Sequence, residues 1–172
     1  MVYAGPDTNC LNIKVNGDGH QPDAVAYDLP DAEGDGSTEQ LVYRDLPLLG
    51  TEAANSENSS LEPFIWKMSG GSGADGERLE AQAQQKANDL DIHRVQAEGE
   101  LDGTLYGHVL HVGLPVPVDG LGDRLSGIYY VDKVSHNFSF EGYKQQFALL
   151  RNAYGDNLDD VLGLGSVLSG VL

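Results

Sequence analysis

The sequence predicts a mainly β protein of the α+β class, with antiparallel strands, long loops and one packed helix. Three observations lead to this fold class. Short apolar runs separated by turn-forming residues occupy residues 1–76, strong helix formers follow from Glu77, and extended runs rich in β-branched and aromatic residues dominate after Asp91. The 172 residues suit one domain, or one small domain with an appendage, and the hydrophobic content of 40% provides a modest core.

Residues 1–76 are predicted to be an acidic, loop-rich region with short strands. Apolar and polar residues alternate in Leu11–Val15, which is typical of a half-buried strand. The other apolar runs that predict strands are Ala24–Tyr27, Leu41–Tyr43 and Phe64–Met68. The Asp- and Gly-rich runs between them predict turns, because they lack the ligand spacing and the closing Glu of an EF-hand calcium loop.

A helix is predicted at residues 77–91, after a Gly- and Ser-rich linker at residues 69–76. Glu77 lies in its first turn, where the helix dipole favours an acidic residue. The apolar residues at helical spacing are Leu79, Ala83, Ala87 and Leu90. Because most of them are small, this narrow stripe predicts that the helix lies close against a sheet.

Residues 77–155 make up the predicted β domain, whose centre is a hairpin at residues 128–151 with a turn at Glu141–Gly142. The predicted cross-strand pairs are Phe140 with Tyr143, Phe138 with Gln145, His136 with Phe147, Val134 with Leu149, and Asp132 with Arg151 as an opposite-charge pair. The predicted core of the hairpin is Tyr130, Val134, His136, Phe138, Phe140, Tyr143, Phe147 and Leu149. His108–Val112 is a further predicted strand.

Residues 156–172 form a predicted tail, with a short helix at residues 157–162 followed by an apolar end. An apolar segment on an otherwise acidic chain usually docks on another surface. That surface is either its own domain or a neighbouring molecule.

Charge and composition narrow the classes of partner. The chain carries 27 acidic and 10 basic residues, so its formal net charge is −17, and its Lys and Arg residues form no cluster. Since nucleic acids and anionic membrane surfaces are bound through such clusters, we expect neither as a partner. No apolar run is long enough to cross a membrane, and residues 1–10 lack the features of a signal peptide. The single Cys10 excludes an internal disulfide and a thiolate zinc cluster.

The sequence carries no recognisable catalytic motif, so we predict neither an enzyme nor a cofactor or metal site. It lacks a nucleophile elbow, a phosphate loop and an HExxH motif. His108 and His111 lie three apart on a predicted strand, so they point to opposite faces and cannot share a metal. The Gly120–Gly127 stretch lacks the GxGxxG spacing of a nucleotide loop and indicates a turn.

The order of the motifs after the linker is more specific than any one of them. The Ala-rich helix precedes an Ala-Glu-Gly-Glu turn at residues 97–100, and a strand that begins at Gly107 follows. The remaining motifs are Leu125–Val131, Val134–His136, Gly142–Phe147 and Leu150–Asn152. In this order, the motifs resemble the C-terminal part of the phage late control protein D family. Its members are the baseplate hub proteins of contractile phage tails and related injection systems, similar to the hub portion of VgrG.

The resemblance implies a small tube-forming, β-barrel-like domain with a structural role. It implies a homotrimer whose ring adapts the hexameric tail tube to the trimeric spike. The implied partners are the inner tail tube protein, the spike protein, and a tape measure protein or a second hub chain. The implied location is the tail or baseplate of a virion or injection particle assembled in the cytoplasm. Since the resemblance covers under half of the chain and family hubs are longer, the chain would be a split or reduced hub.

The acidic composition adds one expectation to this resemblance. A ring whose lumen carried part of the negative charge would repel phosphate backbones or acidic cargo from its wall.

Two functions of other classes remain open from the residues alone. One is a secreted or surface β-sandwich binding module, for example for carbohydrate, with Trp66 and the tyrosines as platforms. The other is a hydrolase built on a carboxylate pair or on His136.

Overall fold

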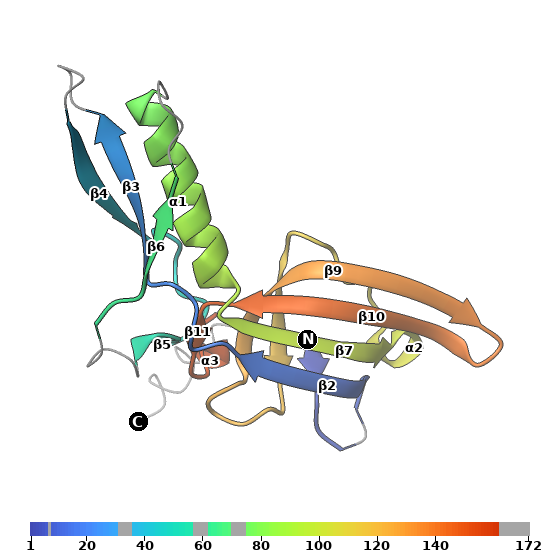
Figure 1. Cartoon of the computed structure of the whole chain (residues 1–172). Coiled ribbons are helices and arrows are strands. Elements are labelled where there is room, and N and C mark those ends of the chain that lie inside the picture. The colour runs from blue at the N-terminus through green and yellow to red at the C-terminus, as the bar shows by residue number, and fades with distance from the viewer. Residues whose placement is uncertain (7, 31–35, 57–61, 70–74, 162–172) are drawn as a thin grey trace, which may run out of the picture. The chain divides into compact units, whose positions relative to one another are not determined.

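The computed structural model describes residues 1–6, 8–30, 36–56, 62–69 and 75–161, and it confirms the mainly β fold (Figure 1). The chain forms two compact units. Unit 1 comprises Met1–Gly17, Leu48–Ala54 and Val95–Leu172, and unit 2 comprises Asp18–Pro47 and Asn55–Arg94. This division differs from the predicted boundaries at residues 76 and 155. The N-terminal strands join the sheet of the C-terminal half, whereas the helix packs on strands that precede it.

Unit 1 is built on a six-stranded sheet that curls into a half-barrel (Figure 1). Its strands in spatial order are β1 (Val2–Tyr3), β8 (Pro115–Asp119), β9 (Gly127–Ser139), β10 (Gly142–Arg151), β7 (Val95–Asp102) and β2 (Cys10–Gly17). The two-residue β1 runs parallel to β8, and all other neighbours are antiparallel. The smaller elements of unit 1 are β5 (Glu52–Ala53), β11 (Ala153–Tyr154), α2 (Gly103–Tyr106) and α3 (Leu158–Val161).

The core of unit 1 covers one face of this sheet. It contains Tyr129, Val131, Phe147, Leu149 and the inward residues of β7. Gly99 of β7 lies directly opposite Phe147 of β10. A Cβ added at Gly99 would lie 2.6 Å from Cζ of Phe147, so the glycine makes room for the aromatic ring.

The β9–β10 hairpin has a different register from the one predicted. Ser139 pairs with Gly142, so the two-residue loop is Phe140–Glu141. Gly142 has a φ of 122°, a conformation that favours glycine, but it begins β10 and lies outside the loop. The slip of two residues keeps the same side chains on each face as far as Val134, because side chains alternate with period two.

A β-bulge in β9 then changes the register again. Ala148 pairs with Lys133, whereas Leu149 pairs with Val131, so Asp132 has no opposite residue. The predicted pair of Asp132 with Arg151 is therefore wrong, and Arg151 pairs with Val95 of β7. The bulge allows both Val131 and Val134, which are three residues apart, to pack on the core face.

Arg151 is fully buried in unit 1. Its guanidinium lies 5.1 Å from the ring centroid of Tyr129 and donates hydrogen bonds to four main-chain carbonyls. The accepting carbonyls are those of Leu49, Leu125, Ser126 and Gly155, at 2.5–3.2 Å. Burial lowers the pKa of the Arg151 guanidinium. Arg151 thus joins the end of β10 to three loops of unit 1.

Two segments differ from the predicted secondary structure. Residues 108–112 form no strand, because Gly107 ends α2 with a φ of 68° and the following residues bond to the Gln145 side chain. Residues 97–100 lie inside β7, where a turn was expected from the resemblance. Residues 70–74 of the predicted linker and 162–172 of the predicted apolar end lie outside the described residues.

Unit 2 consists of a three-stranded sheet and the predicted helix. The strand order is β4 (Ser37–Tyr43), β3 (Ala24–Pro30) and β6 (Ile65–Met68), with β4 antiparallel and β6 parallel to β3. Helix α1 (Gly76–Ile92) confirms the predicted helix. Leu79, Ala83 and Ala87 of its predicted stripe are buried against Val25 and Tyr27 of β3.

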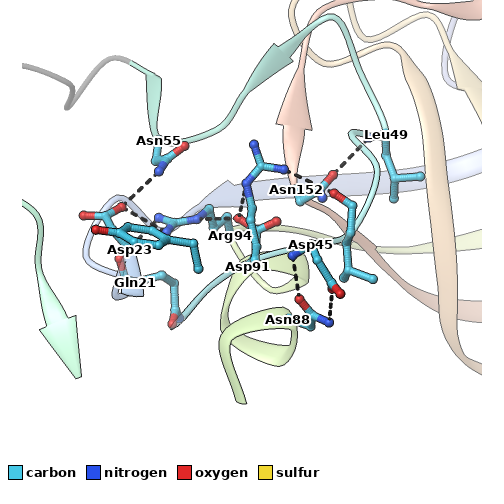
Figure 2. A network of polar contacts seen from close by, with 12 residues as sticks. Gln21, Asp23, Asp45, Leu49, Asn55, Asn88, Asp91, Arg94 and Asn152 are labelled. Atoms are coloured by element: carbon cyan, nitrogen blue, oxygen red, sulfur yellow. Dashed lines mark hydrogen bonds and ion pairs between the residues drawn. The ribbon is translucent and has the colours of Figure 1, made fainter. Parts of the chain in front are cut away.

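A buried polar network holds the ends of the unit 2 segments together (Figure 2). The Arg94 guanidinium lies 3.1 Å from carboxylate oxygens of both Asp91 and Asp23. Asp23 also accepts a hydrogen bond from the Asn55 side chain at 3.1 Å, and Asp91 forms an ion pair with Arg44 at 3.4 Å. Among the described residues, every buried side-chain nitrogen and oxygen has a hydrogen-bond partner. This network is therefore satisfied internally, which favours a structural role for it.

Candidate functional site

The structure places an unpaired strand edge at the outer half of the β9–β10 hairpin. Strand β8 pairs with β9 only from Gly127 to Tyr130, and its preceding residues Gly113 and Leu114 bond to Val131. In the part of the chain that the structure describes, β9 from Asp132 to Ser139 pairs with β10 alone. We call residues 132–147 the hairpin arm; its outer end extends beyond β7 and β8 (Figure 1). One edge of β9 in this arm presents unpaired backbone groups, which can accept another strand.

Aromatic residues that were predicted to be core lie exposed on the arm. Phe138 exposes 76% of its surface and Phe140, in the loop, is fully exposed. The Phe138 ring stacks on Tyr143 with ring centroids 4.5 Å apart, and His136 Nδ1 lies 2.8 Å from the Tyr143 hydroxyl. The prediction that His136, Phe138 and Phe140 belong to the core is therefore wrong. The reason is that no other element of the described residues covers the outer part of the arm.

The other residues of the predicted hairpin core lie on both faces of the sheet. Phe147 and Leu149 are buried in the core, and Val134 is partly buried against it. Tyr130 is 38% exposed and pairs with Leu150 on the face opposite the core. The bulge at Asp132 exchanges the faces to which the preceding residues of β9 point, so Tyr130 leaves the core face. Tyr143 is half-buried, since its ring packs against Gly103 of α2.

Next to the arm lies a set of exposed apolar residues that the sequence analysis missed. They are Leu105 in α2 and Val109, Val112 and Leu114 in the segment between α2 and β8. The buried Gln145 side chain holds this segment, since it accepts from Leu110 N at 2.9 Å and donates to His108 O at 2.7 Å. A polar residue in the middle of an apolar strand face was the only signal of this arrangement in the sequence.

Strand β2 forms a second free edge of the sheet. This strand is the last in the sheet order and pairs only with β7 in the described residues. Its apolar side chains Ile13 and Val15 are only partly buried against the core. Apolar side chains of unit 1 are therefore left partly exposed at β2 as well as at the hairpin arm.

Over β2, β7 and the hairpin arm, the face of the sheet opposite the core is polar and hollowed into a shallow groove. The groove is lined by Asn12, Lys14, Glu98, Gly99, Glu100, Lys133, Ser135, Gln146, Phe147 and Ala148. Lys144 pairs with Glu100 on the same face at 3.3 Å. Lysines on β2, β9 and β10 thus balance the carboxylates of β7, so this face lacks the excess negative charge expected of a repelling wall.

We searched the described residues for side chains that could bind a metal ion or support the alternative functions. No group of three or more His, Cys, Asp or Glu residues within the described ranges could hold a metal ion. No carboxylate of the described residues forms an ion pair with His136, which lies exposed on the arm. In unit 2, Trp66 is 38% exposed, with the Lys86 ammonium 5.7 Å from its ring centroid. No helix of the described segments is long and apolar enough to span a membrane.

Comparison with known proteins finds similarity at the level of fold. No family model and no curated protein matches the sequence. The fold is similar to that of the 43 kDa tail protein of prophage MuSo2 from Shewanella oneidensis, with a TM-score of 0.61 and 14% identity. It is also similar to a tail protein from Neisseria meningitidis MC58, with a TM-score of 0.56 and 12% identity. Each match covers 88% of this chain and 43% of the other, so the chain spans less than half the length of these tail proteins.

Proposed function

We propose that this chain is a structural, non-enzymatic component of a phage tail or of a tail-like injection particle. Within that particle, it acts as part of the baseplate hub, in a ring that adapts the tail tube to the spike. The observation that carries the proposal is the curled sheet of unit 1, which has free edges and a fold similar to that of two tail proteins. The motif order that resembles the late control protein D family supports the same assignment.

The physical case for a ring begins with the edges of the sheet. A half-barrel with one free strand edge at β2 and another at the hairpin arm is an incomplete wall. Exposed strand edges and apolar surface are a liability in an isolated protein, and pairing with further copies removes both. Head-to-tail pairing of one edge with a different edge closes into a ring when the rotation between copies is suitable.

The two faces of the sheet fit different sides of such a wall. The core face is apolar, whereas the opposite face is polar, hollowed and balanced in charge over β2, β7 and the hairpin arm. A wall with paired charges binds neither polyanions nor polycations strongly, so cargo of either sign would pass it. The polar face therefore suits the inside of a passage.

The proposed partners follow from this role. We propose a homotrimer that contacts the inner tail tube protein on one side and the spike protein on the other. A tape measure protein or a second hub chain would complete the passage, and the chain would be located in the tail or baseplate of the particle.

Native mass spectrometry of the purified chain, alone and mixed with the tube and spike proteins of the same particle, tests the proposal. We expect an assembly of three copies, or a complex that contains the tube or spike protein. A strict monomer of 18.4 kDa that joins neither protein would contradict it.

A further inference from the structure

We infer that β2 of one copy pairs with the free edge of β9 in the hairpin arm of the next copy, as an antiparallel strand. The inference rests on the proposed function, because it names the joint by which the ring closes. Both partners in the joint are unpaired edges of one sheet, and both are eight residues long. Because β2 has a register shift between Cys10 and Asn12 and β9 has its bulge at Asp132, the regular part of the joint is residues 12–16 with residues 133–137, about 17 Å long.

Strand direction is consistent with this joint. Strand β2 is antiparallel to β7, β7 to β10, and β10 to β9, so β2 and β9 of one copy run in opposite directions. Copies related by rotation about the axis of a ring keep the direction of each strand relative to that axis. The β2 strand of one copy therefore meets β9 of the next in antiparallel orientation, and the alternation of strand directions continues around the ring.

The side chains on the two edges match face by face. On the core side, β2 offers the partly buried Ile13 and Val15, and β9 offers Val134 and the exposed Phe138. On the polar side, the side chains are Asn12, Lys14 and Asn16 of β2 and Lys133, Ser135 and Asn137 of β9. Pairing the two strands continues both faces of the sheet. It also brings apolar cover to Phe138, which no described element covers within one chain.

We place the two strands in the register that sets Val15 opposite Val134. If Val15 lies opposite Val134 and Ile13 opposite His136, then Lys14 lies opposite Ser135. A slip of two residues in one direction would place Lys14 opposite Lys133, and like charges directly across a strand pair are unfavourable. A slip of two residues in the other direction would place Val15 opposite His136 instead of Val134. Within one copy, Ile13 pairs with Gly99, Gly99 pairs with Phe147, and Phe147 pairs with Val134. Ile13 and Val134 therefore lie at the same position along their strands. The joint therefore displaces each copy by two residues, about 7 Å, which is the kind of stagger that closing a barrel requires.

Engineered disulfides test this joint in the full-length chain. Lys14 and Ser135 of one copy are three strand spacings apart, about 14 Å, and a disulfide needs Cα atoms closer than about 7 Å. A disulfide between these positions must therefore link two copies. The variant is Lys14→Cys with Ser135→Cys, in a Cys10→Ser background that leaves no other thiol. The matched control is Gln96→Cys with Ser135→Cys, because Gln96 lies on the same polar face but on the interior strand β7.

After mild oxidation, we expect the Lys14→Cys/Ser135→Cys chain to form covalent oligomers up to the size of the native assembly, and the control to form none. If the native assembly forms but the two pairs cross-link equally or not at all, the joint is wrong and the proposed ring still stands. If neither protein assembles, even with tube and spike proteins present, the joint and the proposed function both fail.

Discussion

Three phenylalanines of one hairpin should differ sharply in what they contribute to stability. Phe147 is 4% exposed and packs in the core opposite Gly99, so Phe147→Ala should cost about 3–5 kcal/mol of unfolding free energy. Phe138 is 76% exposed, and its main contact is the stacking of its ring on Tyr143. Phe138→Ala should therefore cost only about 0.5–1.5 kcal/mol of unfolding free energy. Phe140 is fully exposed in the loop, so Phe140→Ala should leave stability unchanged.

Urea unfolding with two probes separates these effects by unit. The single Trp66 lies in unit 2, so its fluorescence follows that unit, whereas far-UV circular dichroism follows the strands of both. The measurement is made at low protein concentration, where assembly does not contribute. With a urea slope of about 2 kcal/mol per molar, Phe147→Ala should lower the midpoint of the dichroism transition by about 2 M. The Phe140→Ala transition should overlay that of the unmodified chain.

A different order of stability loss among the three variants would refute this reasoning. A loss in Phe140→Ala or Phe138→Ala as large as that in Phe147→Ala would mean that the end of the arm is packed within one chain. The register with Phe140 opposite Tyr143 would then be correct, and the exposed arm would not be a surface for assembly.

Three further predictions concern the buried polar groups. Arg151→Met removes the donors to four carbonyls and should cost about 3–5 kcal/mol in the same urea assay; a loss below about 1 kcal/mol would contradict it. Arg94→Met removes the guanidinium that bridges Asp23 and Asp91 in unit 2 and should lower the Trp66 fluorescence midpoint, and a midpoint that does not move would contradict the network. Burial raises the pKa of Tyr129 above its usual value of 10.0, so the phenol ionises first in the unfolded chain. Stability should hold below about pH 10 and fall above it, and Tyr129→Phe should show a smaller alkaline loss than the unmodified chain when urea midpoints are compared across that range.

The spacing of apolar residues in the sequence correctly predicted the elements that bury only one of their faces. The spacing of Leu79, Ala83 and Ala87 predicted both the helix and the side that it buries, because one stripe packs on one sheet. The alternation in residues 134–147 likewise predicted which side chains share a face of the hairpin. Both patterns repeat within a few residues, so they do not depend on the rest of the fold.

The register of the hairpin could not be predicted in this way. A slip of two residues leaves every side chain on the same face, so the pattern of residues does not distinguish the two registers. The turn at Phe140–Glu141 and the bulge at Asp132 decide between them. The exposure of Phe138 was missed for a different reason: it depends on where β8 ends, which the sequence of β9 does not contain.

The buried polar residues were the least predictable part of the candidate site. Arg151 bonds to the carbonyl of Leu49, 102 residues earlier in the chain, and Gln145 holds a segment 35 residues away. A carbonyl acceptor is present at every residue, so no sequence motif marks these partners. The division into two units was missed because each unit is assembled from separate stretches of the chain.

Cryo-electron microscopy of the assembled particle, with this chain traced in the density, tests the central claim most directly. We expect a closed ring at the junction of tail tube and spike, with β2 of each copy beside the hairpin arm of the next and the polar face toward the lumen. A particle in which the chain sits as an isolated subunit, with both sheet edges exposed to solvent, would contradict it.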